Sequence, residues 1–189
     1  MITNNVEYIP IGNLCWSAHK LREKNLRLNA YPFDWTCNCL DSIIKMMTDD
    51  FKYILDYNNL KFNQPIKRLL YIENSDNINE LNYDTNSLLY PVLDTKYNII
   101  YPHDFTYNNT DIVINKYKRR CERLLNVLHN TNIDIIFIYD NDTFYKDLYK
   151  KENIDIEKIN SDDKQSILKN LLHTKYNRTN YKIISRHEI

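Results

Sequence analysis

An almost uninterrupted apolar run, Ile-Asp-Ile-Ile-Phe-Ile-Tyr at residues 133–139, constrains the fold more than any other part of the sequence. Runs of this length and composition are typical of a strand buried on both faces in the middle of a parallel sheet. On either side of this strand, apolar residues at helical spacing predict helices at 111–129, 144–151 and 163–174. A last strand is predicted at 181–185. Because helices and strands alternate in the second half of the chain, the sequence predicts an α/β fold, with α+β as the alternative.

The first half of the chain supplies further elements around this sheet. Hydrophobic spacing predicts strands at 6–11, 66–73, 88–93 and 97–101, helices at 15–24 and 38–47 with 51–55 as an extension, and loops at 28–35 and 74–86. A chain of 189 residues fits one domain. We therefore expect residues 1–189 to form a single compact domain, a central sheet with flanking helices, papain-like or Rossmann-like in arrangement.

Composition narrows the classes of function. Lys plus Arg and Asp plus Glu number 25 each, without the clustered basic face that binds nucleic acid. No segment has the ~18 consecutive apolar residues of a membrane-spanning helix, and the first residues lack the features of a signal peptide. We therefore expect a cytoplasmic protein with no nucleic-acid or membrane partner. Cys37 and Cys39 are too close together for a usual zinc pair, so no metal site is expected.

The only glycine is Gly12, between the first predicted strand and the first predicted helix. Glycine usually makes up ~7% of a protein, and its scarcity beside many Asn, Ile, Lys and Tyr residues indicates an AT-rich genome, such as that of a large DNA virus or an AT-rich microbe. A glycine kept against this bias indicates a backbone that needs a positive φ angle or close packing. One glycine cannot form the Gly-x-Gly-x-x-Gly loop of dinucleotide sites, so no cofactor is expected.

Cys15 opens the helix that follows Gly12. The unpaired N–H groups and the dipole at a helix N-terminus stabilise a thiolate and lower its pKa, which makes Cys15 a candidate nucleophile. Asn13 and the backbone N–H of Cys15 are candidates for holding an oxyanion, with a helix N-cap as the alternative role of Asn13. The alternative for Cys15 is a small buried apolar side chain.

A nucleophilic cysteine needs a base, which is usually a histidine. His103 is the strongest candidate because it ends a predicted strand, where α/β folds place functional groups, and its alternative role is that of a turn residue. The other histidines are His19, expected at the surface one turn after Cys15, His129 and His173, expected in last turns of helices, and His187 near the C-terminal end.

A third group has to orient the imidazole. Asp104 adjoins His103, but neighbouring side chains in an extended segment diverge, so Asp104 serves only if the backbone turns there. Asp34, between two aromatic residues, is expected to be half-buried and to need a partner. Asp140, at the end of the central strand, is a third candidate.

Several motifs occur together along residues 6–140: Gly12-x-x-Cys15, Leu21-Arg22, Leu26-Arg27, Pro32-Phe33-Asp34-Trp35, Pro102-His103-Asp104-Phe105 and a basic helix from Lys116 to Leu125. In this combination they resemble a family of papain-like cysteine peptidases. The resemblance implies a thiol-dependent hydrolase or acyltransferase, with Cys15 as nucleophile and His103 as base. It does not fix the third residue, and Cys37 and Cys39 are not part of the pattern.

The sequence therefore predicts a papain-like cysteine hydrolase, a peptidase or an acyltransferase, acting on an amide, ester or thioester of a peptide or acyl-bearing substrate. The predicted site residues are Cys15, His103, Asp104 and Asp34, with Gly12 and Asn13 at the oxyanion position. The alternative is a catalytically inactive binding module of the same fold, in which a buried polar cluster replaces the active site. A third hypothesis is a glycan- or lipid-modifying hydrolase built on a Rossmann-like sheet.

Overall fold

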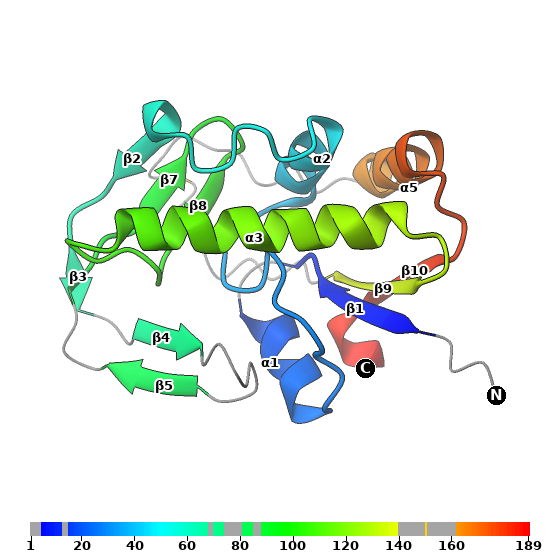
Figure 1. Cartoon of the computed structure of the whole chain (residues 1–189), viewed down its shortest axis with the longest axis horizontal. Coiled ribbons are helices and arrows are strands. Elements are labelled where there is room, and N and C mark those ends of the chain that lie inside the picture. Colours follow the sequence, from blue (N-terminus) through cyan, green and yellow to red (C-terminus); the bar gives the residue numbers. More distant parts are fainter. Residues whose placement is uncertain are drawn as a thin grey trace.

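The computed structural model describes residues 5–12, 15–67, 70–73, 81–84, 88–139, 150 and 162–189. Figure 1 shows a sheet between helices in one part of the molecule and short antiparallel strands in the other. Asn13, Asp140 and all but residue 150 of the helix predicted at 144–151 lie outside the described residues.

The apolar run forms the middle strand of a parallel sheet, as predicted. β9 (Asp134–Tyr139) lies between β1 (Val6–Pro10) and β10 (Tyr181–Ser185), and it runs parallel to both. Successive side chains of a strand point to opposite faces. Phe137 and Ile138 are both buried, so apolar contacts cover both faces of β9.

Helices flank this sheet on two sides (Figure 1). α3 (Thr110–His129) leads into β9, and α5 (Asp162–Tyr176) precedes β10, on one side of the sheet. α1 (Trp16–Glu23), which follows β1, and η2 (Arg186–Glu188), which follows β10, lie on the other side. The predicted α/β class is therefore confirmed.

Antiparallel strands make up the other part of the fold. β2 (Leu60–Phe62), β7 (Val92–Asp94) and β8 (Ile99–Tyr101) form one sheet in this order, after the short helix η1 (Tyr57–Asn59). Two further pairs are β3 (Ile66–Lys67) with β6 (Leu88–Leu89), and β4 (Leu70–Glu73) with β5 (Leu81–Asp84). The prediction of a loop at 74–86 is wrong for β5, because backbone pairing with β4 makes a strand of a short polar sequence.

α2 (Leu40–Thr48) ends at a sharp turn. Asp50 and Phe51 have positive φ angles of 54° and 61°, and the N–H of Phe51 donates to the carbonyl of Met46 at 2.8 Å. This bond closes the last turn of the helix. Residues 51–55 form turns, so the predicted extension of the helix is wrong.

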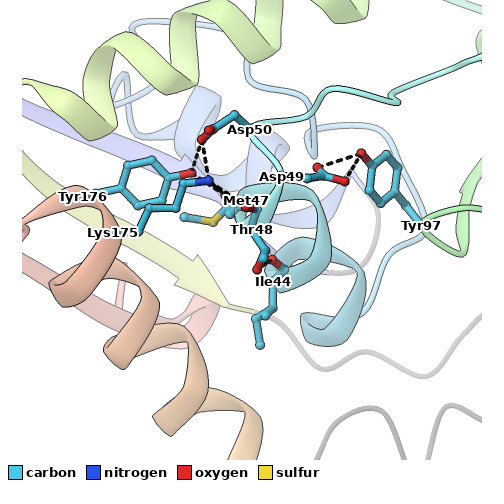
Figure 2. A network of polar contacts seen from close by, with 8 residues as sticks. All are labelled: Ile44, Met47, Thr48, Asp49, Asp50, Tyr97, Lys175 and Tyr176. Carbon is cyan, nitrogen blue, oxygen red and sulfur yellow. Dashed lines mark hydrogen bonds and ion pairs between the residues drawn. The ribbon is translucent and has the colours of Figure 1, made fainter.

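Two side chains at the end of α5 hold the end of α2 (Figure 2). The Tyr176 hydroxyl donates to the Met47 carbonyl at 2.6 Å, and the Lys175 ammonium donates to the Thr48 carbonyl at 2.7 Å. Lys175 also forms an ion pair with Asp50 at 2.8 Å. These bonds satisfy carbonyls that the helix itself leaves without partners.

Asparagine occupies positions that glycine often fills in other proteins. Asn25, Asn98 and Asn177 have φ angles of 55°, 57° and 51°, in the left-handed region that asparagine tolerates better than most residues. At the end of α1, the N–H of Leu26 donates to Leu21 and the N–H of Asn25 donates to Arg22. These are the two bonds of a Schellman motif, so Asn25 ends α1 in place of a glycine.

Candidate active site

Cys15 lies at the start of α1, just beyond the carboxyl end of β1. It has helical angles of φ −72° and ψ −11°, and its carbonyl accepts the N–H of His19 at 2.8 Å. The side chain is half-buried. Burial raises the pKa of the Cys15 thiol and outweighs a backbone hydrogen bond that lowers it. The direction is therefore opposite to the expected one, because the loss of water around the sulfur outweighs the backbone hydrogen bond.

Gly12 is buried at the junction of β1 and α1. It does not have a positive φ angle, so the left-handed alternative for this glycine is wrong. The alternative that remains is close packing, since a buried position leaves little room for a Cβ atom.

His19 and Trp35 bring α1 together with the Pro-Phe-Asp-Trp segment. Their rings meet edge to face, with centroids 5.2 Å apart. His19 is half-buried and lines a cavity that is open to solvent, so it lies at the surface as predicted. Burial, and after it the positive charge of Arg22, lower the pKa of His19 below its ordinary value of 6.5. Its imidazole is therefore neutral near pH 7.

Asp34 is completely buried, more deeply than predicted, and it has the partner that the sequence led us to expect. Arg27, which is also buried, forms an ion pair and hydrogen bond with its carboxylate, and the N–H of Tyr31 donates to it at 3.1 Å. The Arg27 guanidinium lies 5.9 Å from the centroid of the Trp35 ring. Asp34 thus fixes the loop that supports Trp35 against His19.

His103 follows β8 in a bend, where it is half-buried between anchored neighbours. Phe105 is buried and packs edge-on against Tyr101, with ring centroids 6.0 Å apart. The Asp104 carboxylate is bonded by Lys116 and by the Tyr117 hydroxyl, the latter at 2.8 Å. Both oxygens of Asp104 therefore have partners on α3, and the loop of His103 is fixed on both sides.

One pair of backbone hydrogen bonds brings the Trp35 and His103 segments together. Cys37 donates to the Ile100 carbonyl at 2.8 Å and Ile100 donates to the Cys37 carbonyl at 2.9 Å, in antiparallel pairing. Trp35 lies two residues before Cys37, and His103 three residues after Ile100. In an antiparallel pair, the chain before Cys37 and the chain after Ile100 extend in the same direction from the bridge. Both residues therefore lie toward the same end of this bridge.

A cavity of about 720 Å³ opens beside α1 and η2. Its lining residues are Trp16, His19, Lys20, Glu23, Arg186, His187 and Ile189. His187 had no predicted role, although it follows the predicted strand at 181–185. Since β1 and β10 run parallel to β9, their carboxyl ends meet at one edge of the sheet, and this brings η2 beside the helix of Cys15.

Residues 6–167 match the model of the family described as "Putative papain-like cysteine peptidase (DUF1796)". The chain belongs to this family. The resemblance predicted from the motifs is therefore confirmed, and the match of the papain-like cysteine peptidase model extends beyond residue 140 into α5. Cys15, Asp34 and His103 fall within the matched residues, and η2 lies outside them.

No curated protein and no solved structure matches the chain. In the part of the chain that the structure describes, no three His, Cys, Asp or Glu residues form a group that could hold a metal ion. Among the described helices, none is both long and apolar enough to cross a membrane.

Proposed function

We propose that the chain is a cysteine hydrolase in which Cys15 attacks an amide, ester or thioester carbonyl and His103 acts as the base. The observation that carries this proposal is the position of Cys15 in a member of this family. Its thiol is half-buried at a helix N-terminus, at the carboxyl edge of a parallel sheet, and one turn before His19, which lines a cavity. Functional groups of α/β folds gather at this edge.

The surroundings of His103 support its role. Because of the bridge between Cys37 and Ile100, His103 lies toward the same end of the paired segments as Trp35. The Trp35 ring contacts His19, which is one turn from Cys15. Asp104 and Asp34 act as positioning residues, because Asp104 anchors the loop of His103 to α3 and Asp34 anchors the loop of Trp35. Neither carboxylate has to receive a proton in this scheme.

The raised pKa of Cys15 determines how the reaction begins. The thiol is protonated at rest, so His103 takes its proton as the sulfur–carbon bond forms. The backbone N–H of Cys15, at the start of α1, holds the oxyanion. The imidazolium then returns the proton to the leaving amine, alcohol or thiol. Water, or an amine in an acyl transfer, releases the acyl group and restores the thiol.

Alkylation by iodoacetamide, mapped by mass spectrometry, tests the pair. Cys15 should react much faster near neutral pH than the buried thiols of Cys37, Cys39 and Cys121. His103→Ala should slow the labelling of Cys15 by about a hundredfold, the lower end of what a general base contributes. His173→Ala, at an exposed histidine of α5, is the matched control and should leave the rate unchanged.

Equal labelling of all four cysteines would contradict the role of Cys15 as the nucleophile. An unchanged rate of Cys15 alkylation in His103→Ala would contradict the role of His103 as the base. The Cys15→Ser variant separates an enzyme from the alternative of an inactive binding module. If the chain is an enzyme, the variant keeps its fold and loses turnover of an ester or thioester substrate. If the chain is a binding module, the variant either becomes less stable or shows no specific change.

A further inference from the structure

β10 is an edge strand of the parallel sheet, and its outer edge carries backbone groups that point away from β9. The N–H of Ile135 donates to the Asn180 carbonyl at 3.1 Å, so the even-numbered residues of β10 are the ones that bond to β9. The N–H and C=O groups of Tyr181 and Ile183 therefore point outward. In the part of the chain that the structure describes, no strand pairs with them.

A cavity of about 590 Å³, here called the β10-edge pocket, lies along this outer edge. Its lining residues are Lys169, His173, Arg178, Thr179, Tyr181, Lys182, Ile183 and Ile184. Tyr181 and Ile183 pack against the core cluster that contains Leu172 of α5. Because side chains of a strand alternate, Lys182 points to the opposite face of the sheet. A cavity lined from both faces of one strand lies at the edge of that strand.

The β10-edge pocket is basic. Lys169, on the α5 side, and Lys182, on the opposite side, are exposed, and neither is in an ion pair with another described residue. Arg178 is a third cation, but its guanidinium already donates to the carbonyls of Asn130 and Ile133. Among the described lining residues there is no Asp or Glu. The two lysines are therefore the charges that a ligand can use, one on each face of the strand.

We propose that the β10-edge pocket binds an extended acidic segment of a partner protein, which adds a strand to the sheet beside β10. The backbone of this segment pairs with Tyr181 and Ile183, in the way that exposed strand edges take up peptides. Successive side chains of the added strand point to opposite faces. Two neighbouring Asp or Glu residues of the partner therefore reach Lys169 and Lys182, one lysine each.

The charge of the pocket favours an acidic partner over a second copy of this chain. Pairing of two β10 edges would bring the lysines of two pockets together, and like charges across an interface repel. The paired stretch is short, because the N–H of Ser185 already donates to Glu188 at 2.5 Å and closes the edge beyond Ile184. Binding at this edge needs no reaction at Cys15, so its test is separate from that of the proposed hydrolase.

A fluorescein-labelled peptide, Thr-Val-Glu-Asp-Val-Thr, tests the pocket by fluorescence anisotropy with the full chain. It should bind saturably. Replacing its Glu-Asp by Gln-Asn should weaken binding by about tenfold, because two exposed ion pairs are lost. A strand turns every second N–H toward its neighbour. Methylation of the backbone nitrogen of Glu in one peptide, and of Asp in another, should therefore abolish the binding of one and spare the other.

The matched variants of the protein are Lys182→Glu and Lys118→Glu, both at exposed positions. Lys182→Glu should weaken the binding of the acidic peptide by about tenfold, because a repulsion replaces an exposed ion pair. Lys118→Glu, on α3, makes the same change of net charge away from β10 and should leave the affinity unchanged.

Absence of binding by the acidic peptide, or equal binding of the two methylated peptides, overturns the proposal. Equal weakening by Lys182→Glu and Lys118→Glu overturns it as well, since net charge alone would then explain the binding. Self-association of the chain that competes with the peptide in sedimentation equilibrium would make a second copy the occupant. Tighter binding of a single-stranded oligothymidylate than of the peptide would make nucleic acid the occupant. Both of these results also contradict an acidic protein segment.

Discussion

Asp104 shows how a single carboxylate holds the candidate base in position. Burial would raise its pKa, but the charges of Lys116 and Arg120 and the bonds from Lys116 and Tyr117 outweigh it. The pKa of Asp104 therefore lies below its ordinary value of 3.8. Since the folded state favours the charged form, this contact stabilises the protein above the unfolded pKa and is lost as the pH falls through the folded one.

Asp104→Asn should lower the free energy of unfolding at pH 7 by about 2 kcal/mol, the range of a hydrogen bond to a charged group. The stabilities of the wild type and the variant should converge as the pH falls below about 4, where the carboxylate becomes protonated. Urea unfolding at pH 7 and at decreasing pH measures both effects. Asp163→Asn, at an exposed acid of α5, is the control. A constant difference at every pH would contradict the charge-based role.

At the same scale, residue types and local context predicted where Cys15 would lie and that Asp34 would need a partner. They did not predict the direction of the Cys15 pKa shift. A helix N-terminus is visible in sequence, whereas the burial of a thiol depends on segments that are distant in the chain. The contact between His19 and Trp35 has the same origin, because it joins a helix to a loop.

Among the elements, the end of α1 offers the clearest test of how this chain manages with one glycine. Asn25 is exposed and has a φ angle of 55°. Alanine there should lower the free energy of unfolding by about 1 kcal/mol, because its Cβ atom disfavours the left-handed region. Glycine should leave stability unchanged or raise it, since it has no Cβ atom. Urea denaturation of the two variants measures the difference, and equal stabilities would contradict the Schellman role of Asn25.

Element boundaries were predictable where periodicity is strong and local. β10 begins and ends as predicted, and α3 and β9 differ from their predicted bounds by one residue. The end of α2 was not predictable, because Lys175 and Tyr176, more than 120 positions away, hold its carbonyls. The pairing of β4 with β5 was missed because a strand of four residues with two polar side chains has little signal of its own.

At the scale of the whole molecule, alternating elements predicted the α/β class but not the neighbours of the candidate site. The strand order β1-β9-β10 puts the ends of β1 and β10 on either side of the middle strand, at the same edge. Arg186 and His187 reach the helix of Cys15 only through this topology. Sequence spacing cannot reveal such a meeting, since more than 160 residues separate the two segments.

The same topology predicts that the contacts between α5 and α2 stabilise the fold without controlling the candidate site. The Tyr176 hydroxyl donates to the Met47 carbonyl and contacts Asp50 at 3.0 Å, on the side of the sheet opposite α1 (Figures 1 and 2). Tyr176→Phe removes one of the two side-chain donors of this carbonyl, since Lys175 also donates to it at 3.0 Å, so unfolding should become easier by about 1 kcal/mol.

Cys15 alkylation by iodoacetamide should keep its rate in Tyr176→Phe, because α1 retains its contacts with β1 and η2 on the other side of the sheet. Tyr181→Phe, at a half-buried tyrosine of β10, is the matched control and should change stability by less than about 0.5 kcal/mol. Urea unfolding and the alkylation rate, measured on the same preparations, give the two readouts. A slower Cys15 reaction in Tyr176→Phe would mean that α5 and α2 also position the nucleophile, and that the two sides of the sheet are energetically coupled.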